Sequence, residues 1–274
     1  MRRTLLKKTL LLLPLLLITV IGHSQTAEYY YLSGKSKLIL KNYKGAVSDF
    51  TDAIKLSPNI ADYYFARGKG HYNLEDYNEA IQDFTKAIEI KPKFEDAYYH
   101  LGKSKNKLQD FRGAITAYSN AITINPKNGD AYNNRGNVRC SVQDYKGAIT
   151  DFTNAITINP KDETGYFNRG IARIDIEDYT GAIDDFTTSI NLVPKDSEAF
   201  YYRGTAKVKV QDFSGAVDDF SQVIDVIPNY ADAYYQRGMT KIKSGKKEDG
   251  CTDLKKAGDL GSSKAIEQSK KSCQ

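Results

Sequence analysis

The chain has 274 residues, of which 41% are hydrophobic and 27% charged, an ordinary composition for a folded protein with a sizeable core. The formal charge of +5 comes mainly from Arg2, Arg3, Lys7 and Lys8, and without those four the counts are 35 basic against 34 acidic residues. A remainder so close to neutral has no global positive field, so we do not expect nucleic acid as a partner.

Residues 1–24 have the pattern of a secretory signal peptide. A basic start precedes an apolar run from Thr9 to Ile21, and small residues follow. We therefore expect cleavage between Ser24 and Gln25, export to the periplasm or the cell exterior, and no membrane insertion afterwards. The alternative is an uncleaved anchor, but the run of about 13 residues is interrupted by Pro14, and a spanning helix needs roughly 20.

Glycine and proline recur at a fixed interval along the rest of the chain. The glycines lie 34 residues apart at Gly34, Gly68, Gly102, Gly136, Gly170, Gly204 and Gly238. The prolines lie at the same interval at Pro58, Pro92, Pro126, Pro160, Pro194 and Pro228. This spacing indicates units at residues 27–60, 61–94, 95–128, 129–162, 163–196 and 197–230, a degenerate seventh at 231–260, and a C-terminal cap at 261–274.

Within each unit, numbered 1 to 34, the residue pattern predicts two helices. Alanine at position 20, an aromatic residue at 24 and isoleucine at 28 share one helical face, and the proline at 32 ends that helix. The glycine at position 8 and the alanine at 20 are small, which lets the two helices cross closely. Aspartate at position 16 is expected to cap the second helix, at Asp76, Asp110, Asp144, Asp178 and Asp212.

This pattern resembles the tetratricopeptide repeat, a 34-residue unit with aromatic residues at positions 4 and 24, glycine at 8, alanine at 20 and proline at 32. The match runs from Ala27 to about Leu260. Two departures are that position 4 is never tryptophan and that position 11 carries a basic residue or histidine instead of tyrosine. The resemblance implies an all-α, right-handed superhelical solenoid of seven helix–turn–helix repeats with a short C-terminal capping helix.

Opposite charges recur together at positions 7 and 23. The pairs are Arg67 with Asp83, Arg135 with Asp151, Arg169 with Asp185, Arg203 with Asp219, and Arg237 with Asp253. The third unit lacks both charges, and the first has serine and aspartate. We hypothesise an ion pair that links the two helices of one unit. The alternative is that these residues are solvated surface charges.

Of the three cysteines, two lie near the C-terminus. We hypothesise a disulfide between Cys251 and Cys273, because an exported protein reaches a compartment where disulfides persist. The alternative is two free buried thiols. Cys140 stands alone inside a repeat and is expected to be a small core residue.

No catalytic or metal-binding motif is present. The two histidines beyond residue 24, His71 and His100, belong to different repeats, and there is no zinc motif or phosphate-binding glycine loop. We therefore predict no enzymatic activity and no cofactor.

The resemblance implies that first helices line a concave binding surface, mainly through positions 2, 5, 6, 9, 12 and 13. Position 5 carries Tyr31, Phe65, Tyr99, Asn133, Phe167, Tyr201 and Tyr235. If these rings are exposed, they would anchor a partner. The alternative is that they pack between neighbouring repeats.

Polar groups at positions 6 and 9 complete the candidate site. The resemblance implies that Asn134 and Asn168, with His100 in the unit before, could hold a peptide backbone as an asparagine ladder. Lysines at position 9, namely Lys35, Lys69 and Lys103, would make the N-terminal half basic, and the acids at position 2, namely Glu28, Asp62, Asp96 and Asp130, offset this charge. Asn137 and Asn168 match part of a clamp for chaperone C-termini, but Asn133 and Glu198 stand where cations are needed, so that partner is not expected.

The sequence therefore predicts a non-enzymatic scaffold that binds a protein or an extended peptide in its groove. The alternative is a structural module that forms a homo-oligomer through the aromatic first-helix face.

Overall fold

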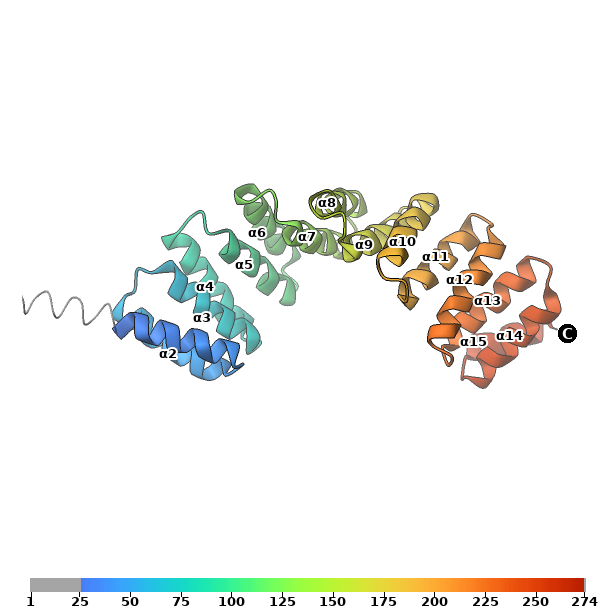
Figure 1. Ribbon diagram of the computed structural model, residues 1–274, viewed down its shortest axis with the longest axis horizontal. Coiled ribbons are helices and arrows are strands. Elements are labelled where there is room, and N and C mark those ends of the chain that lie inside the picture. The colour runs from blue at the N-terminus through green and yellow to red at the C-terminus, as the bar shows by residue number, and fades with distance from the viewer. Residues whose placement is uncertain (1–25, 274) are drawn as a thin grey trace, which may run out of the picture. The chain divides into compact units, whose positions relative to one another are not determined.

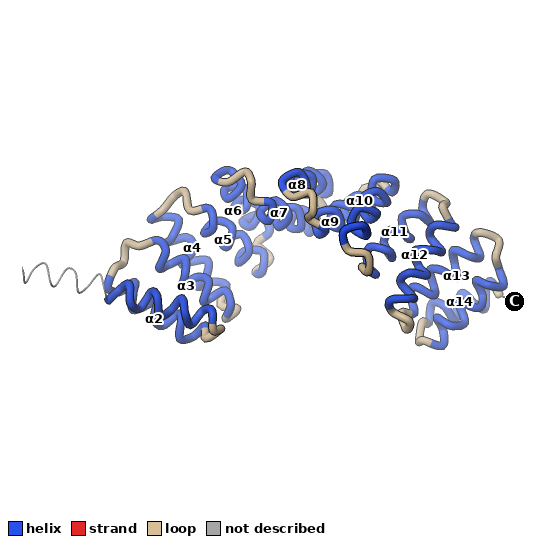
Figure 2. The backbone as a smooth tube through the Cα atoms, viewed as in Figure 1, coloured by secondary structure: helices blue, strands red, loops and turns tan. Residues whose placement is uncertain are grey.

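The computed structural model describes residues 26–273, which form helices joined by short turns, with no strand in that range (Figure 2). The expected signal peptide and its cleavage point lie outside these residues. Within residues 26–273, no helix combines the length and the hydrophobicity that crossing a bilayer requires. The fold is an all-α helical repeat solenoid.

The described residues belong to two compact units, the first ending at Asn134 and the second beginning at Arg135. In unit 1 the helices follow one another in chain order (Figure 1). They are helical residues 26–39, α2 (Tyr43–Leu56), α3 (Ala61–Asn73), α4 (Tyr77–Ile90), α5 (Glu95–Lys107) and α6 (Phe111–Ile124). Helix α7 (Gly129–Ser141) contains the boundary.

The helices of unit 2 also follow one another in chain order, and the last of them is the short helix α15 (Figure 1). Its helices are α8 (Tyr145–Ile158), α9 (Glu163–Asp175), α10 (Tyr179–Leu192), α11 (Ser197–Lys209), α12 (Phe213–Val226), α13 (Ala231–Lys243), α14 (Lys247–Asp259) and α15 (Ser263–Ser272).

The turn inside each repeat has the same backbone. Position 15 takes a left-handed conformation in all seven repeats, with a φ of 58–65° at the six non-glycine residues and 87° at Gly245. The N–H of position 16 then donates to the carbonyl of position 11, for example from Asp212 to Lys207 at 2.9 Å. This closure satisfies a carbonyl that the end of the first helix would otherwise leave unpaired.

The contact between positions 8 and 24 brings the two helices of a repeat together. The ring at position 24 is fully buried in six repeats, in Phe50, Phe84, Tyr118, Phe152, Phe186 and Phe220. A Cβ placed on the facing glycine would meet that ring at 2.6–3.0 Å, closer than carbon atoms can approach. Only glycine therefore permits this helix spacing. In the seventh repeat, which has Leu254 instead of a ring, a Cβ on Gly238 would meet the backbone oxygen of Gly250 at 2.8 Å.

Four of the five expected aspartate caps are present, and one is not. The side chains of Asp110, Asp144, Asp178 and Asp212 each accept a hydrogen bond from the glycine N–H at position 19. Asp76 makes no such bond, so its prediction was wrong. Its position 19 is Glu79, and a Cβ at the equivalent Gly147 would lie 2.1 Å from Oδ2 of the capping Asp144 carboxylate. The Asp76 carboxylate instead lies 3.6 Å from His71 Nδ1.

All five predicted Arg–Asp ion pairs are present, which confirms the hypothesis and excludes solvated surface charge. The shortest N–O distances are 2.7 Å for Arg67–Asp83, 2.6 Å for Arg135–Asp151, 2.6 Å for Arg169–Asp185, 2.7 Å for Arg203–Asp219 and 2.7 Å for Arg237–Asp253. The aspartate side chains are at most 7% exposed. Most of these arginines donate through both Nε and Nη2, the bidentate geometry that a planar guanidinium allows.

Four of these buried aspartates, all except Asp83, also take a second cation from position 11, where the tetratricopeptide repeat has tyrosine. Asp219 lies 2.9 Å from Lys207 Nζ as well as 2.7 Å from Arg203. Arg203 additionally donates to the Thr187 hydroxyl of the preceding repeat at 3.1 Å. The same buried carboxylate therefore holds both helices of its repeat, and its arginine also contacts the repeat before.

The first repeat, which lacks the arginine, preserves this arrangement with different groups. The Ser33 hydroxyl donates to Asp49 at 2.6 Å, and Lys37 Nζ lies 2.7 Å from the same carboxylate. A hydroxyl and one cation thus replace two cations.

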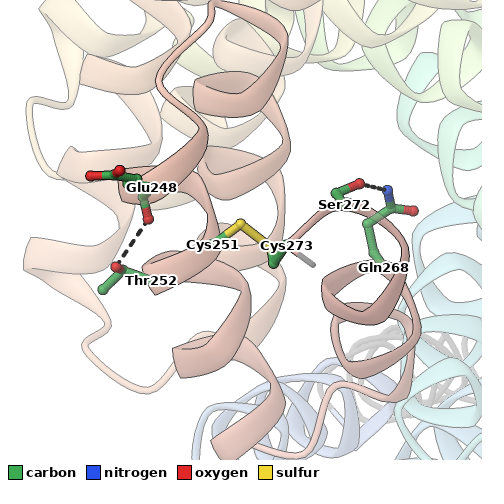
Figure 3. The surroundings of a disulfide bond; sticks show 6 residues. All are labelled: Glu248, Cys251, Thr252, Gln268, Ser272 and Cys273. Atoms are coloured by element: carbon green, nitrogen blue, oxygen red, sulfur yellow. Dashed lines mark hydrogen bonds between the residues drawn. A yellow bond between two sulfur atoms is a disulfide. The ribbon is translucent and has the colours of Figure 1, made fainter.

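The C-terminal helix α15 caps the last repeat and is covalently attached to it. Ala265 is buried against Leu254 and Ala257 of α14. A disulfide joins Cys251 in α14 to Cys273 at the end of α15 (Figure 3). Cys140 is half-buried beside the core of the fourth and fifth repeats, and burial raises the pKa of its thiol to about 11, so it is protonated at neutral pH.

We predict that Asp219→Asn lowers the free energy of unfolding by about 3 kcal/mol, because it leaves Arg203 and Lys207 partly buried without an anion. Asp218→Asn, at the exposed neighbouring residue, is the matched control and should change it by less than about 0.5 kcal/mol. Urea denaturation of both variants measures the difference. Equal shifts in the two midpoints would contradict the role of the buried carboxylate.

The double variant Cys251→Ser, Cys273→Ser should lose about 3 kcal/mol of stability, because the disulfide closes a loop between residues 22 positions apart. Hydrogen exchange should show the loss first in α15. Addition of a reductant should destabilise the parent chain and leave the double variant unchanged; an equal response of the two proteins would show that the disulfide does not hold the cap.

Candidate binding faces of the two units

The position-5 rings of unit 1 pack between repeats and still keep part of their surface open. The Tyr31 ring centroid lies 5.9 Å from that of Phe50 in its own repeat and 4.9 Å from that of Tyr63 in the next. The Phe65 ring centroid lies 5.8 Å from that of Phe84 and 4.8 Å from that of Phe94, both in its own repeat, and 5.2 Å from that of the His100 ring of the next. Both alternatives raised by the sequence thus hold in part, since each ring is a packing residue with a half-exposed face.

Three lysines lie over these rings in unit 1. Lys35 Nζ is 5.3 Å from the Tyr31 ring centroid, and Lys69 Nζ is 5.6 Å from that of Phe65. Lys103 Nζ is 5.8 Å from the Tyr99 centroid. Each lysine follows its ring by four residues, the helical spacing that stacks side chains. Among residues 26–273, none of the three has an ion-pair partner. We call this set of three lysines and three rings the lysine row.

An open pocket of about 240 Å³ lies on the lysine row between the first two repeats. The Tyr31 and Phe65 rings and Leu38 form apolar walls, and the ammonium groups of Lys35 and Lys69 stand beside them. The lining residues are Tyr31, Lys35, Leu38, Ile39, Phe65, Ala66 and Lys69. The pocket therefore offers an apolar surface next to two cations.

His100 packs against rings instead of adding a charge to this face. Its ring lies 5.2 Å from that of Phe65 and 5.3 Å from that of Tyr99, and its Nδ1 is 2.9 Å from the Asp96 carbonyl oxygen. Burial lowers the pKa of the imidazole, so it is neutral at pH 7.

The amides at position 6 are used between repeats. The side-chain nitrogen of Asn134 donates to the Tyr99 hydroxyl at 3.1 Å and to the Asp130 carbonyl at 2.8 Å. Gln236 likewise donates to the Tyr201 hydroxyl of the preceding repeat at 3.3 Å. Both N–H donors of Asn134 are therefore engaged, which leaves its oxygen for a ligand and weakens the asparagine-ladder hypothesis.

In unit 2 the position-5 rings pack in the same way. The Phe167 centroid lies 5.7 Å from that of Phe186, and the Tyr201 centroid lies 5.8 Å from that of Phe220. Tyr235 packs against the cap helix, with Lys264 Nζ 5.5 Å above its ring. Asn168 is half-buried and Asn137 is exposed, whereas Asn133 is half-buried in unit 1.

A second pocket, of about 180 Å³, opens on unit 2. It is lined by Ser197, Glu198, Tyr201, Tyr202, Ile227 and Tyr230. Sequence reasoning found only Tyr201 as a site residue here. Tyr202 is the one aromatic residue at position 6 apart from a histidine, and Tyr230 is the one tyrosine at position 34. Comparing the residues at these two positions across the repeats could have identified both tyrosines.

Among the residues that the structure describes, no group of three His, Cys, Asp or Glu side chains is arranged to hold a metal ion.

Comparison with known families identifies the repeats that carry these faces. Residues 27–60 match the family described as tetratricopeptide repeat, and residues 68–109 and 103–141 match the family described as TPR repeat. No curated protein matches the chain.

Solved structures with the same fold cover most of the chain. The C-terminal part of a TPR repeat-containing protein from Cytophaga hutchinsonii is 18% identical, with a TM-score of 0.75 over 86% of this chain and 98% of that one. A tetratricopeptide repeat protein from Parabacteroides merdae is 20% identical, with a TM-score of 0.64 over 91% and 100%. YrrB, described as a TPR protein with an unusual peptide-binding site, is 24% identical, with a TM-score of 0.63 over 69% and 97%.

We predict that Tyr201→Phe lowers stability by about 1 kcal/mol, because the hydroxyl donates to Asp232 and accepts from Gln236. Tyr235→Phe is the matched control, since its hydroxyl has no such partners among the described residues.

Burial and the bond to Asp232 raise the pKa of Tyr201. Folding therefore favours the protonated phenol, and the parent chain should lose stability as the pH rises above about 10.

Urea midpoints measured at pH 7 and at pH 10.5 check both parts. The Tyr201→Phe variant should show a smaller fall between the two pH values than the Tyr235→Phe variant. An identical fall would show that the Tyr201 phenol is not perturbed.

Proposed function

Because the chain belongs to the tetratricopeptide repeat family, we propose that it is a non-enzymatic scaffold that binds proteins or extended peptides through the first-helix faces of its repeats. The observation that carries the proposal is the lysine row, where unpaired cations and half-exposed rings recur from one repeat to the next. Interfaces favour such rigid aromatic area next to charge.

The charge of the lysine row favours an acidic segment. The acids at position 2, namely Glu28, Asp62 and Asp96, precede the lysines by seven residues on the same helices. Seven residues of helix span about 10 Å, roughly a Debye length at physiological ionic strength, so each acid is largely screened from the lysine on its own helix. An extended chain carrying carboxylates and an apolar side chain for the 240 Å³ pocket has the complementary chemistry.

We further propose that the scaffold works outside the cytoplasm, after removal of residues 1–24. Two observations support this, namely the basic-then-apolar pattern of that segment and the disulfide between Cys251 and Cys273, a bond that persists in oxidising compartments.

Selection of a random peptide display library on the folded chain tests the binding proposal. Acidic peptides with an apolar residue should be enriched, and their affinity should fall with rising salt. The triple variant Lys35→Glu, Lys69→Glu, Lys103→Glu should weaken the selected peptides at least about tenfold. The control reverses three exposed lysines of unit 1 away from the row, Lys44, Lys93 and Lys127, and should keep the affinity.

Enrichment of peptides without acidic residues, or equal losses in the two triple variants, would contradict the proposal. Sedimentation of the chain without peptide distinguishes self-association: a stable dimer that dissociates on adding the selected peptide would show that the face pairs with a second copy when no partner is present.

A further inference from the structure

The 180 Å³ pocket of unit 2 has a composition unlike the rest of the first-helix faces. Three tyrosine rings surround it, with centroids 5.7 Å apart for Tyr201 and Tyr202 and 5.8 Å apart for Tyr201 and Tyr230. Sites for drug-sized molecules usually enclose about 300–1,000 Å³, so this pocket has room for a single side chain.

The pocket carries negative charge that the protein does not neutralise. The Glu198 carboxylate lines it and has no hydrogen-bond or ion-pair partner within residues 26–273. Asp232, just outside, accepts the Tyr201 hydroxyl and pairs with Lys264 at 3.2 Å. The pKa of Tyr230 is raised by burial first and then by nearby charges that include Asp232 and Glu198, while Lys264 acts in the opposite direction. A carboxylate beside several π-faces is the arrangement that attracts a cation.

The next repeat shows the same acid and ring with a cation already bound. There Asp232 and Tyr235 occupy positions 2 and 5, and Lys264 occupies position 34 counted from Ala231. Lys264 Nζ lies 3.2 Å from the Asp232 carboxylate and 5.5 Å from the Tyr235 ring centroid. The chain thus supplies its own ligand to this acid–ring pair.

In the sixth repeat the equivalent residues are Glu198, Tyr201 and Tyr230. The acid and the position-5 ring are the same types as in the seventh repeat, but position 34 is a tyrosine and not a lysine. Tyr230 adds a third ring beside Tyr202 and supplies no cation to Glu198. The sixth repeat therefore has an acid next to more aromatic surface than the seventh, without an internal cation paired to that acid.

We propose that the pocket formed by Glu198, Tyr201, Tyr202 and Tyr230 binds the cationic head of a lysine or arginine side chain from a partner protein. The inference rests on the proposed scaffold function, because the cation belongs to a protein segment, and it adds a basic contact on unit 2 to the acidic preference of the lysine row on unit 1.

The test uses the folded chain labelled with 3-fluorotyrosine, whose ring signals are followed by fluorine NMR. The probes are acetyl-Gly-Gly-Lys-Gly-Gly-amide and the same peptide with norleucine, which keeps the whole alkyl chain of lysine and lacks its ammonium group. The variants Tyr201→Phe, Tyr202→Phe and Tyr230→Phe each remove one signal and so assign the three rings of the pocket. The lysine peptide should shift these three signals, and its dissociation constant should be at least about tenfold lower than that of the norleucine peptide. An arginine peptide should behave like lysine, and citrulline like norleucine.

Glu198→Gln and Tyr230→Leu should each weaken the lysine peptide about tenfold. Asp225→Asn, which removes an exposed carboxylate on α12 outside the pocket, is the matched control and should not change the binding. Unchanged thermal midpoints would show that the variants are folded. If a variant is unfolded, the comparison of the lysine and norleucine peptides on the parent chain still tests the proposal.

Equal binding of the norleucine peptide would overturn the proposal and would show that the pocket binds the alkyl chain and not the charge. Absence of any shift up to about 50 mM lysine peptide would also overturn it. The proposed function fails separately, through the charge-reversal variants of the lysine row, so success at one site and failure at the other can be distinguished.

Discussion

The contact of the position-8 glycine with the ring at position 24 determines which side chains of the first helices reach the surface of each repeat. The helices of a repeat approach so closely there that a single added carbon would lie within 3.0 Å of the ring. That spacing places the position-5 ring against the position-24 ring of its own repeat, as Tyr31 lies against Phe50 and Phe65 against Phe84. The half-exposed rings and the lysines that lie over them are therefore a consequence of packing, and they recur because the packing recurs.

Buried charge strengthens this geometry and makes it specific. In four repeats the buried aspartate binds two cations from the first helix, as Asp219 does with Arg203 and Lys207. Ion pairs of this kind contribute less net stability than their Coulomb attraction suggests, because both charges lose water. Their directional, bidentate bonds instead favour one alignment of the helices over others. The first repeat keeps the carboxylate without the arginine, since Ser33 and Lys37 satisfy Asp49.

The sequence predicted what depends on the 34-residue period alone, including the helical hairpins and the Arg–Asp pairs. Prediction from the sequence failed where the contacts of a side chain depend on one particular neighbouring residue. Asp76 does not cap because Glu79 replaces a glycine, and Asn134 donates to Tyr99 because a hydroxyl lies within reach in the repeat before. The tyrosine pocket was missed because position 34 lies in a turn, and its residue matters only when a neighbouring acid and ring are known in space. Partner, cleavage and compartment remain proposals.

The claim that first-helix faces are the contact surface can be tested directly by photo-crosslinking. A benzoylphenylalanine replaces Ile39, which is 81% exposed and lines the pocket of the lysine row, and in a second protein it replaces the exposed Lys86 on the second helix α4. With a selected acidic peptide bound and irradiated, the account predicts a crosslink from position 39 and none from position 86. A crosslink from position 86 alone would place the partner on the second helices and contradict the account.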